Sequence, residues 1–144
     1  MDISRRDLGL LFPFLAASRA QAQEPQPLPS KIYANSAIPY KADPETAGKK
    51  AREFFHGVNH SGFDLEMHET VLGPGVRTHA PHKHVHEEII VVFEGTVEVS
   101  IEGKTAPAEA GSVIYFGSNQ MHSVRNAGIA PCRYYVLELR GAEA

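Results

Sequence analysis

The stretches HKHVHEE (residues 82–88) and GSVIYFGSNQMHSVRN (residues 111–126) decide how this chain folds. Three of their imidazoles and one of their carboxylates are interpreted as one metal site: His82, His84, Glu88 and His122. A mixed nitrogen and oxygen ligand set suits a first-row divalent ion such as Mn, Fe, Ni, Cu or Zn. On an octahedral ion, such a set leaves positions open for water, substrate or dioxygen.

Side-chain alternation places the first two of these residues on one face of a strand. His82 and His84 are separated by one residue, and strand side chains alternate with period two. Glu88 keeps the same parity, and His122 must come from a strand that returns beside the first. Ligands on neighbouring strands of a closed sheet can converge on one interior point. The two stretches therefore predict a closed sheet around a metal.

The surrounding chain also predicts strands. From Gly62 onward apolar and polar residues alternate. Turn signals divide this region at short intervals, at Gly73-Pro74-Gly75, Gly95, Glu102-Gly103, Gly111, Gly117-Ser118-Asn119 and Asn126-Ala127-Gly128. Many short strands of this kind indicate an all-β fold, a small sandwich or barrel.

One short N-terminal helix is expected before the strands. Asp43-Pro44-Glu45 is typical of an N-cap, a proline at the first helical position and an acidic first turn. Gly57 can end the helix. The apolar residues between them recur at helical spacing: Ala47, Ala51, Phe54 and Phe55. We expect this helix to cover a sheet with its apolar face.

The two motifs resemble those of the cupin family, which run G-x5-H-x-H-x3-4-E-x6-G and G-x5-P-x-G-x2-H-x3-N. The matching residues are His82, His84, Glu88 and Gly95 in the first motif and Gly111, His122 and Asn126 in the second. Gly75 stands one place too early for the leading glycine, Gly117 replaces the usual proline, and Asn119 replaces the usual glycine. Asparagine tolerates a positive φ, so the turn should survive. The resemblance covers roughly residues 62–140 and implies a single cupin β-barrel, a double-stranded β-helix or jelly roll, that binds a metal.

Residues 1–22 are typical of an export signal. Arg5-Arg6 precede a short apolar stretch, and Ala20-Gln21-Ala22 offers a cleavage site. The start of the chain resembles a twin-arginine signal, which predicts a periplasmic protein with no membrane attachment once the signal is removed. We expect a flexible leader over residues 23–40 and the single barrel domain over residues 41–144.

Export in the folded state bears on the choice of metal. Mn and Fe lie at the weak end of the divalent affinity series and would lose an open site to Cu or Zn. A protein that folds around its ion in the cytoplasm protects such a choice. We therefore expect one divalent transition metal per chain, with Mn or Fe favoured over Ni, Zn or Cu.

Other residues are expected near the open coordination positions or away from them. Candidates for lining a substrate pocket are Gln120, Met121, Tyr115, Phe116 and Tyr134, about half of which should face outward by alternation. His79 and His86 are candidates for supporting the ligands, joining them, or lying exposed in a loop. Glu87 is expected to have a solvent or hydrogen-bonding role rather than to coordinate. We expect ordinary surface or satisfied histidines at His56, His60 and His68, and solvated charges at Glu138 and Arg140.

Composition narrows the function. The formal net charge is −3 with no basic run, and tryptophan is absent, so a nucleic-acid partner is not expected. A small-molecule partner is expected instead. A homodimer through the barrel faces is common in similar proteins, although nothing in the sequence requires it.

The resemblance implies dioxygenases, isomerases, lyases and decarboxylases as candidate reaction classes. We favour a dioxygenase because an exported protein meets oxygen and phenolic compounds. A non-redox isomerase or lyase is an alternative. Another is a non-catalytic module that binds a small acid or sugar, since no acid–base signature is visible outside the ligand set.

Overall fold

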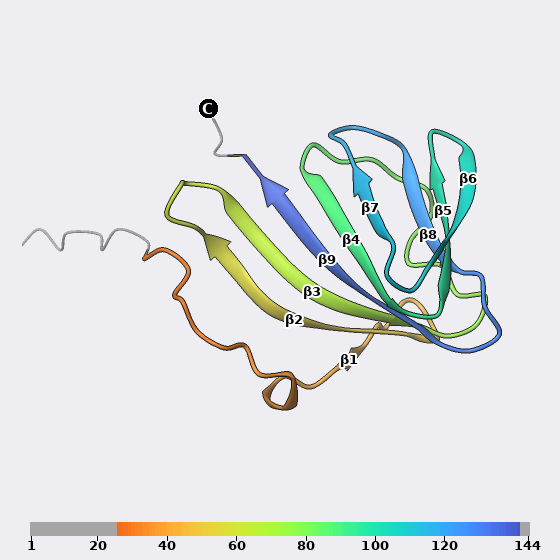
Figure 1. The fold of residues 1–144 in the computed structure, drawn as a ribbon, viewed down its shortest axis with the longest axis horizontal. Coiled ribbons are helices and arrows are strands. Elements are labelled where there is room, and N and C mark those ends of the chain that lie inside the picture. Colours follow the sequence, from red (N-terminus) through yellow and green to blue (C-terminus); the bar gives the residue numbers. More distant parts are fainter. Residues whose placement is uncertain (1–25, 142–144) are drawn as a thin grey trace, which may run out of the picture.

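The computed structural model describes residues 26–141, which form two antiparallel β-sheets (Figure 1). The larger sheet has the strand order β1-β2-β3-β9-β4-β7, and the smaller one has the order β6-β5-β8. The elements are η1 (Asn35–Ala37), β1 (Lys41–Ala42), β2 (Lys49–Val58), β3 (Asp64–Leu72), β4 (Glu87–Glu94), β5 (Thr96–Ile101), β6 (Lys104–Glu109), β7 (Val113–Phe116), β8 (His122–Asn126) and β9 (Cys132–Arg140). Among these described residues, no helix is long and apolar enough to cross a membrane. The prediction of an all-β barrel is confirmed.

Apolar side chains from both sheets pack against one another to form the core. Ile90 and Phe116 from the larger sheet and Val97 and Val124 from the smaller one are buried in a single cluster. Strand β9 alternates between buried and less buried residues over residues 132–136, as the two-residue period of a strand requires. The apolar residues whose two-residue spacing predicted strands are therefore the residues whose side chains fill the interior.

The segment between β3 and β4 joins the free edge of the smaller sheet. The Thr78 amide donates to the Val124 carbonyl at 3.0 Å. Farther along, the His82 amide donates to the His122 carbonyl at 3.1 Å, and the His122 amide donates back at 2.8 Å. This pairing places the first histidine motif directly beside the second, as the sequence predicted.

The predicted helix over residues 43–57 is wrong, because most of this stretch forms β2. The Asp43 carboxylate does accept hydrogen bonds from the amides of Glu45 and Thr46, both at 2.9 Å, but it closes only a turn. Strand β2 then pairs along β3, with a register shift between Glu53 and Phe55. Phe54 is therefore the extra residue of a β-bulge, which breaks the two-residue period and makes the apolar spacing look helical.

Residues 26–40 lie against β2. The Leu28 amide donates to the Val58 carbonyl at 2.8 Å, and the Tyr33 and Phe55 rings have centroids 5.1 Å apart. Arg52 donates to the carbonyl of Asn35 at 2.9 Å. The expected export signal, residues 1–22, lies outside the described residues. The expected domain boundaries also stay a prediction.

Candidate metal centre

Three histidine rings face one another at one end of the barrel. The ring centroids of His82 and His122 are 4.7 Å apart, those of His84 and His122 are 4.8 Å apart, and those of His82 and His84 are 5.4 Å apart. One nitrogen from each ring lies within 4.8 Å of the other two. The backbone pairing of His82 with His122 produces this convergence.

Glu88, near the start of β4, joins the three rings. Its Oε2 lies 3.3 Å from Nε2 of His84 and 3.9 Å from Nε2 of His122. Glu88 pairs with Glu138 of β9 on one side and Phe116 of β7 on the other, so its strand is held within the sheet. The structure thus brings together all four residues that the sequence nominated as ligands.

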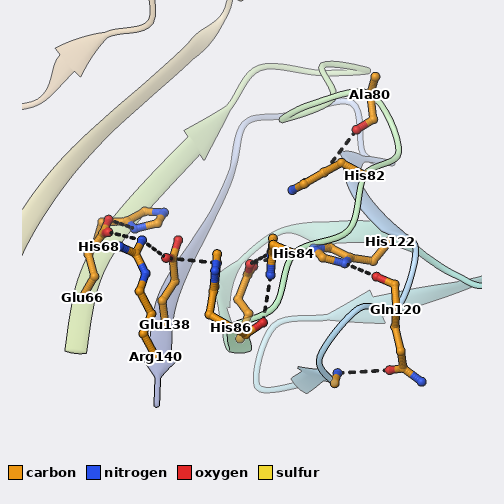
Figure 2. A network of polar contacts seen from close by, with 12 residues as sticks. Glu66, His68, Ala80, His82, His84, His86, Gln120, His122, Glu138 and Arg140 are labelled. Atoms are coloured by element: carbon orange, nitrogen blue, oxygen red, sulfur yellow. Dashed lines mark hydrogen bonds and ion pairs between the residues drawn. The ribbon is translucent and has the colours of Figure 1, made fainter. Parts of the chain in front are cut away.

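Each of these imidazoles is oriented by a backbone carbonyl two residues away. Nδ1 of His82 lies 3.2 Å from the Ala80 oxygen. Nδ1 of His84 lies 2.8 Å from the His86 oxygen, and Nδ1 of His122 lies 2.8 Å from the Gln120 oxygen (Figure 2). A carbonyl can only accept, so Nδ1 carries the ring proton and Nε2 keeps its lone pair. This is the tautomer that binds a metal through Nε2.

His122 provides a direct test of whether these residues fit a cation. Its side chain is 3% exposed, and its ring stacks on the buried ring of Phe116 with centroids 4.2 Å apart. Within residues 26–141, Nε2 of His122 is buried and has no hydrogen-bond partner. A buried polar atom left unsatisfied is unfavourable, and coordination would satisfy it. Burial also lowers the pKa of His122, which favours the neutral imidazole that binds metal.

The electrostatics of Glu88 also fit a cation. Burial and, to a lesser extent, the nearby carboxylate of Glu138 together raise the pKa of Glu88 to about 7. A divalent cation at this point would stabilise the ionised carboxylate and remove that penalty. The four residues therefore have the chemistry and the orientation to hold a divalent metal.

The centre opens into a cavity of about 910 Å³ inside the barrel. Glu138 and Arg140, which we expected as solvated charges, both line this cavity. The expectation is wrong for Glu138, whereas the Arg140 side chain is 39% exposed and remains solvated. The Glu138 side chain is only 14% exposed. Both residues share the parity of Tyr134 on β9, which turns them inward.

The two histidines with open roles lie beside the centre. The ring of His86 stacks on that of His84, while its Nε2 lies 3.2 Å from the Glu138 carboxylate. The ring of His79 meets that of His82 edge-on at 5.3 Å, and His79 Nε2 lies 3.5 Å from the Lys49 ammonium. Both contact a nominated ligand, which agrees with a supporting role. One ring nitrogen of His86 also lies within 4.8 Å of a ring nitrogen of His84 and a carboxylate oxygen of Glu88, which is close enough for a shared metal.

The five residues nominated for the pocket lie in different places. Tyr134 is buried and lines the cavity. Phe116 is in the core behind His122, and Tyr115, its neighbour, is 54% exposed on the opposite face of β7. Gln120 and Met121 are exposed, and neither is among the described residues that line the cavity. The Gln120 carbonyl instead orients His122.

The atypical turn of the second motif survives, as the sequence predicted. Asn119 has φ 60°, the conformation for which glycine is usual at this place. The Gly117 amide donates to the Gln120 side-chain oxygen at 3.0 Å, which closes the turn. The motif's last residue, Asn126, is buried and donates to the carbonyls of Leu72 and Ala130 at 2.9 and 2.8 Å. It therefore ties β8 to the end of β3 and to the loop that precedes β9.

Comparison with known proteins agrees with this architecture. Residues 68–138 match the cupin domain family. A cupin 2 conserved barrel domain protein from Salinispora arenicola is 25% identical, with a TM-score of 0.57 over 81% of this chain and 88% of that one. A predicted oxalate decarboxylase from Thermotoga maritima is 21% identical, with a TM-score of 0.63 over 76% of this chain and 99% of that one.

A further solved structure is described as a polyketide cyclase from Streptomyces resistomycificus. It is 17% identical, with a TM-score of 0.60 over 81% of this chain and 87% of that one. The comparison with curated proteins gives no match. The matched segment and the shared architecture together support the cupin family, and the described part of this chain forms a cupin β-barrel.

Proposed function

We propose that this chain is a metal-dependent enzyme that acts on a small molecule in the barrel cavity, with dioxygenation as the favoured reaction. The observation that carries the proposal is the convergence of one nitrogen from each of three histidine rings, two of which lie near the Glu88 carboxylate, each ring being held by a backbone carbonyl. Ligands fixed in this way favour one coordination geometry. Solved structures of similar barrels carry different descriptions, a predicted oxalate decarboxylase and a polyketide cyclase, so the reaction class is argued from the site.

Each part of the site has a defined role in this proposal. A divalent ion there would supply Lewis acidity and, if redox-active, the capacity to activate dioxygen. His82, His84, Glu88 and His122 would hold it. The Phe116 ring limits the movement of His122 by stacking on it. We propose Mn or Fe as the ion, since the ligand set is mixed nitrogen and oxygen and folded export would protect a weakly bound metal.

A second candidate, a non-redox isomerase or lyase, is favoured by one specific observation. Glu138, His86 and Glu66 line the cavity beside the metal centre, and carboxylates and imidazoles can move a proton to and from a substrate carbon. The sequence showed no acid–base group outside the ligand set, and the structure places these residues there. Their presence also weakens the alternative of a non-catalytic module.

Oxygen consumption separates these candidates. Protein exported by its own signal would be purified, its metal identified by elemental analysis, and the metal-replete sample offered phenols, diketones and sugar acids. Oxygen uptake with product formation supports the dioxygenase, whereas turnover without oxygen uptake supports the isomerase or lyase. Ligand binding with no turnover across this panel would contradict both and favour a binding module.

A further inference from the structure

Three glutamates lie side by side across the inner face of the larger sheet, and only one of them belongs to the metal centre. Glu66 of β3 pairs with Glu138 of β9, and Glu138 pairs with Glu88 of β4. All three line the cavity. Like charges directly opposite each other on neighbouring strands are destabilising, so the row requires compensating partners.

Two of the glutamates and their compensating side chains form a compact group, which we call the distal cluster: Glu66, His68, Glu138 and Arg140 (Figure 2). Nη2 of Arg140 donates to Glu138 at 2.6 Å and to Glu66 at 3.3 Å. Nδ1 of His68 lies 3.2 Å from the Glu66 carboxylate. The side chains of Glu66, His68 and Glu138 are 19%, 22% and 14% exposed, whereas that of Arg140 is 39% exposed. The carboxylates and the imidazole are therefore partly shielded from bulk water, and the guanidinium lies at the solvent edge.

The distal cluster keeps hydrogen-bonding capacity that the described residues do not use. Both contacts of Glu138, to His86 and Arg140, are made through Oε2, which leaves Oε1 as an acceptor. His68 makes its contact through Nδ1, which leaves Nε2. Carboxylate oxygens accept hydrogen bonds, and hydroxyl groups donate them and form short, strong bonds to an ionised acceptor.

We infer that the distal cluster binds the hydroxyl groups of a polyhydroxylated acid whose other end reaches the metal centre. The inference rests on the proposed function, because the metal is taken to bind the acid end. His86 connects the two regions, since its ring stacks on His84 and its Nε2 contacts Glu138. The substrate class is therefore a small sugar acid rather than an apolar phenol.

A second metal ion is a poorer occupant of the distal cluster. Its two carboxylates already share the Arg140 guanidinium, which would repel a cation placed between them. A hydroxylated molecule can bind with the Arg140 guanidinium in place, because its hydroxyls can donate to the free oxygen of Glu138 and accept from the guanidinium.

A matched pair of ligands tests the inference on the metal-loaded protein. D-gluconate and 2-hydroxyhexanoate share a six-carbon chain, a carboxylate and an α-hydroxyl group, but only gluconate carries hydroxyls farther along. Calorimetric titration should show gluconate binding at least about tenfold more tightly, since one hydrogen bond to a charged group is of that order. Equal affinities, or tighter binding of 2-hydroxyhexanoate, would overturn the inference.

Variants then assign the effect to the distal cluster. In Glu138→Gln and Glu66→Gln, the preference for gluconate should fall at least about threefold. Glu98→Gln, on β5 in a surface pair with Arg125, should keep it. A preference unchanged in both cluster variants would contradict the inference, and the wild-type comparison still decides if a variant fails to fold.

Metal content, measured on the same samples, separates this inference from the proposed function. Protein that takes up no metal would overturn the proposed function and, with it, this two-ended binding. Protein that binds one metal per chain but shows no preference for gluconate would overturn only the inference. Two metals per chain, with the second lost in Glu138→Gln, would replace it with a second metal site.

Discussion

The imidazole ring of His86 lies flat against that of His84, with centroids 3.5 Å apart and planes 4° from parallel. The two rings nevertheless belong to different networks. His84 Nε2 faces Glu88 within the metal centre, whereas His86 Nε2 faces Glu138. Stacking therefore places His86, which is not a proposed ligand, against His84, which is. Substituting each histidine alone should separate their contributions to metal binding.

His84→Ala should lose most of the bound metal, because it removes a ligand from a set of four. His86→Ala should keep metal near one per chain and alter activity instead. Elemental analysis of both variants, purified side by side, checks this. Metal near one per chain in His84→Ala would show that the ligand assignment is wrong.

Metal uptake should increase as pH rises through about 7, where Glu88 of the metal-free protein ionises. The folded pKa is raised above its ordinary value of 4.5, so protonated Glu88 stabilises the metal-free fold below pH 4.5. That stabilisation is lost between 4.5 and about 7. Metal affinities measured across this range should show the rise in the wild type and a weaker one in Glu88→Gln. An equally steep rise in the variant would assign the pH dependence to the histidines.

Glu69→Gln should reduce the free energy of unfolding by about 3–5 kcal/mol, since it breaks a buried ion pair. Glu69 is fully buried and accepts hydrogen bonds from Arg52, Arg133 and Tyr40. Urea denaturation measures the loss. The matched control is Glu98→Gln in the exposed pair with Arg125, where less than about 1 kcal/mol is expected. Similar losses in both variants would contradict the special role of the buried pair.

Tyr134→Phe should leave the free energy of unfolding nearly unchanged. Within residues 26–141 the buried Tyr134 hydroxyl makes no hydrogen bond of ordinary geometry, although the Thr70 and Thr78 side chains lie near it, so its removal should cost little. Tyr40→Phe should instead cost about 1–3 kcal/mol, because its hydroxyl donates to the Glu69 carboxylate at 2.8 Å. Thermal unfolding of the two variants compares them. A larger loss in Tyr134→Phe would mean that its hydroxyl is satisfied in solution.

Replacing Arg5 and Arg6 together with lysine should stop export, if the twin-arginine route is correct. Cell fractionation and the mass of the mature protein would show it, and a processed periplasmic product from the double variant would contradict this route. A variant with lysine in place of Arg19 is a suitable control, because it keeps the arginine pair.

The sequence predicted the metal centre better than the pocket. His82 and His84 were identifiable by their spacing, although the structure gives His82 only an isolated bridge to His122 and places His84 outside the described strands. The β2 strand was missed because the bulge at Phe54 disguises its period as a helical one. Glu138 was misplaced because no nearby motif marks it, although it shares the parity of Tyr134, which the sequence had nominated. Following that alternation to the end of β9 would have found it.

The distal cluster was beyond reach for another reason. Glu66 and Glu138 are far apart in the chain, and only the register of β3 with β9 brings them together. No local pattern encodes such a register. It depends on which strands become neighbours, and that is decided by the packing of the whole barrel.

Strand β9 lies between β3 and β4, although it follows every other strand along the described residues. A ribosome must therefore release residues 132–140 before the two parts of the larger sheet can join. Until then β3 and β4 each present an unsatisfied edge, and chaperone binding at those edges would matter most at that moment. The two halves of the larger sheet join only through a strand that emerges after both of them, so deleting residues 132–140 should prevent folding rather than shorten the sheet.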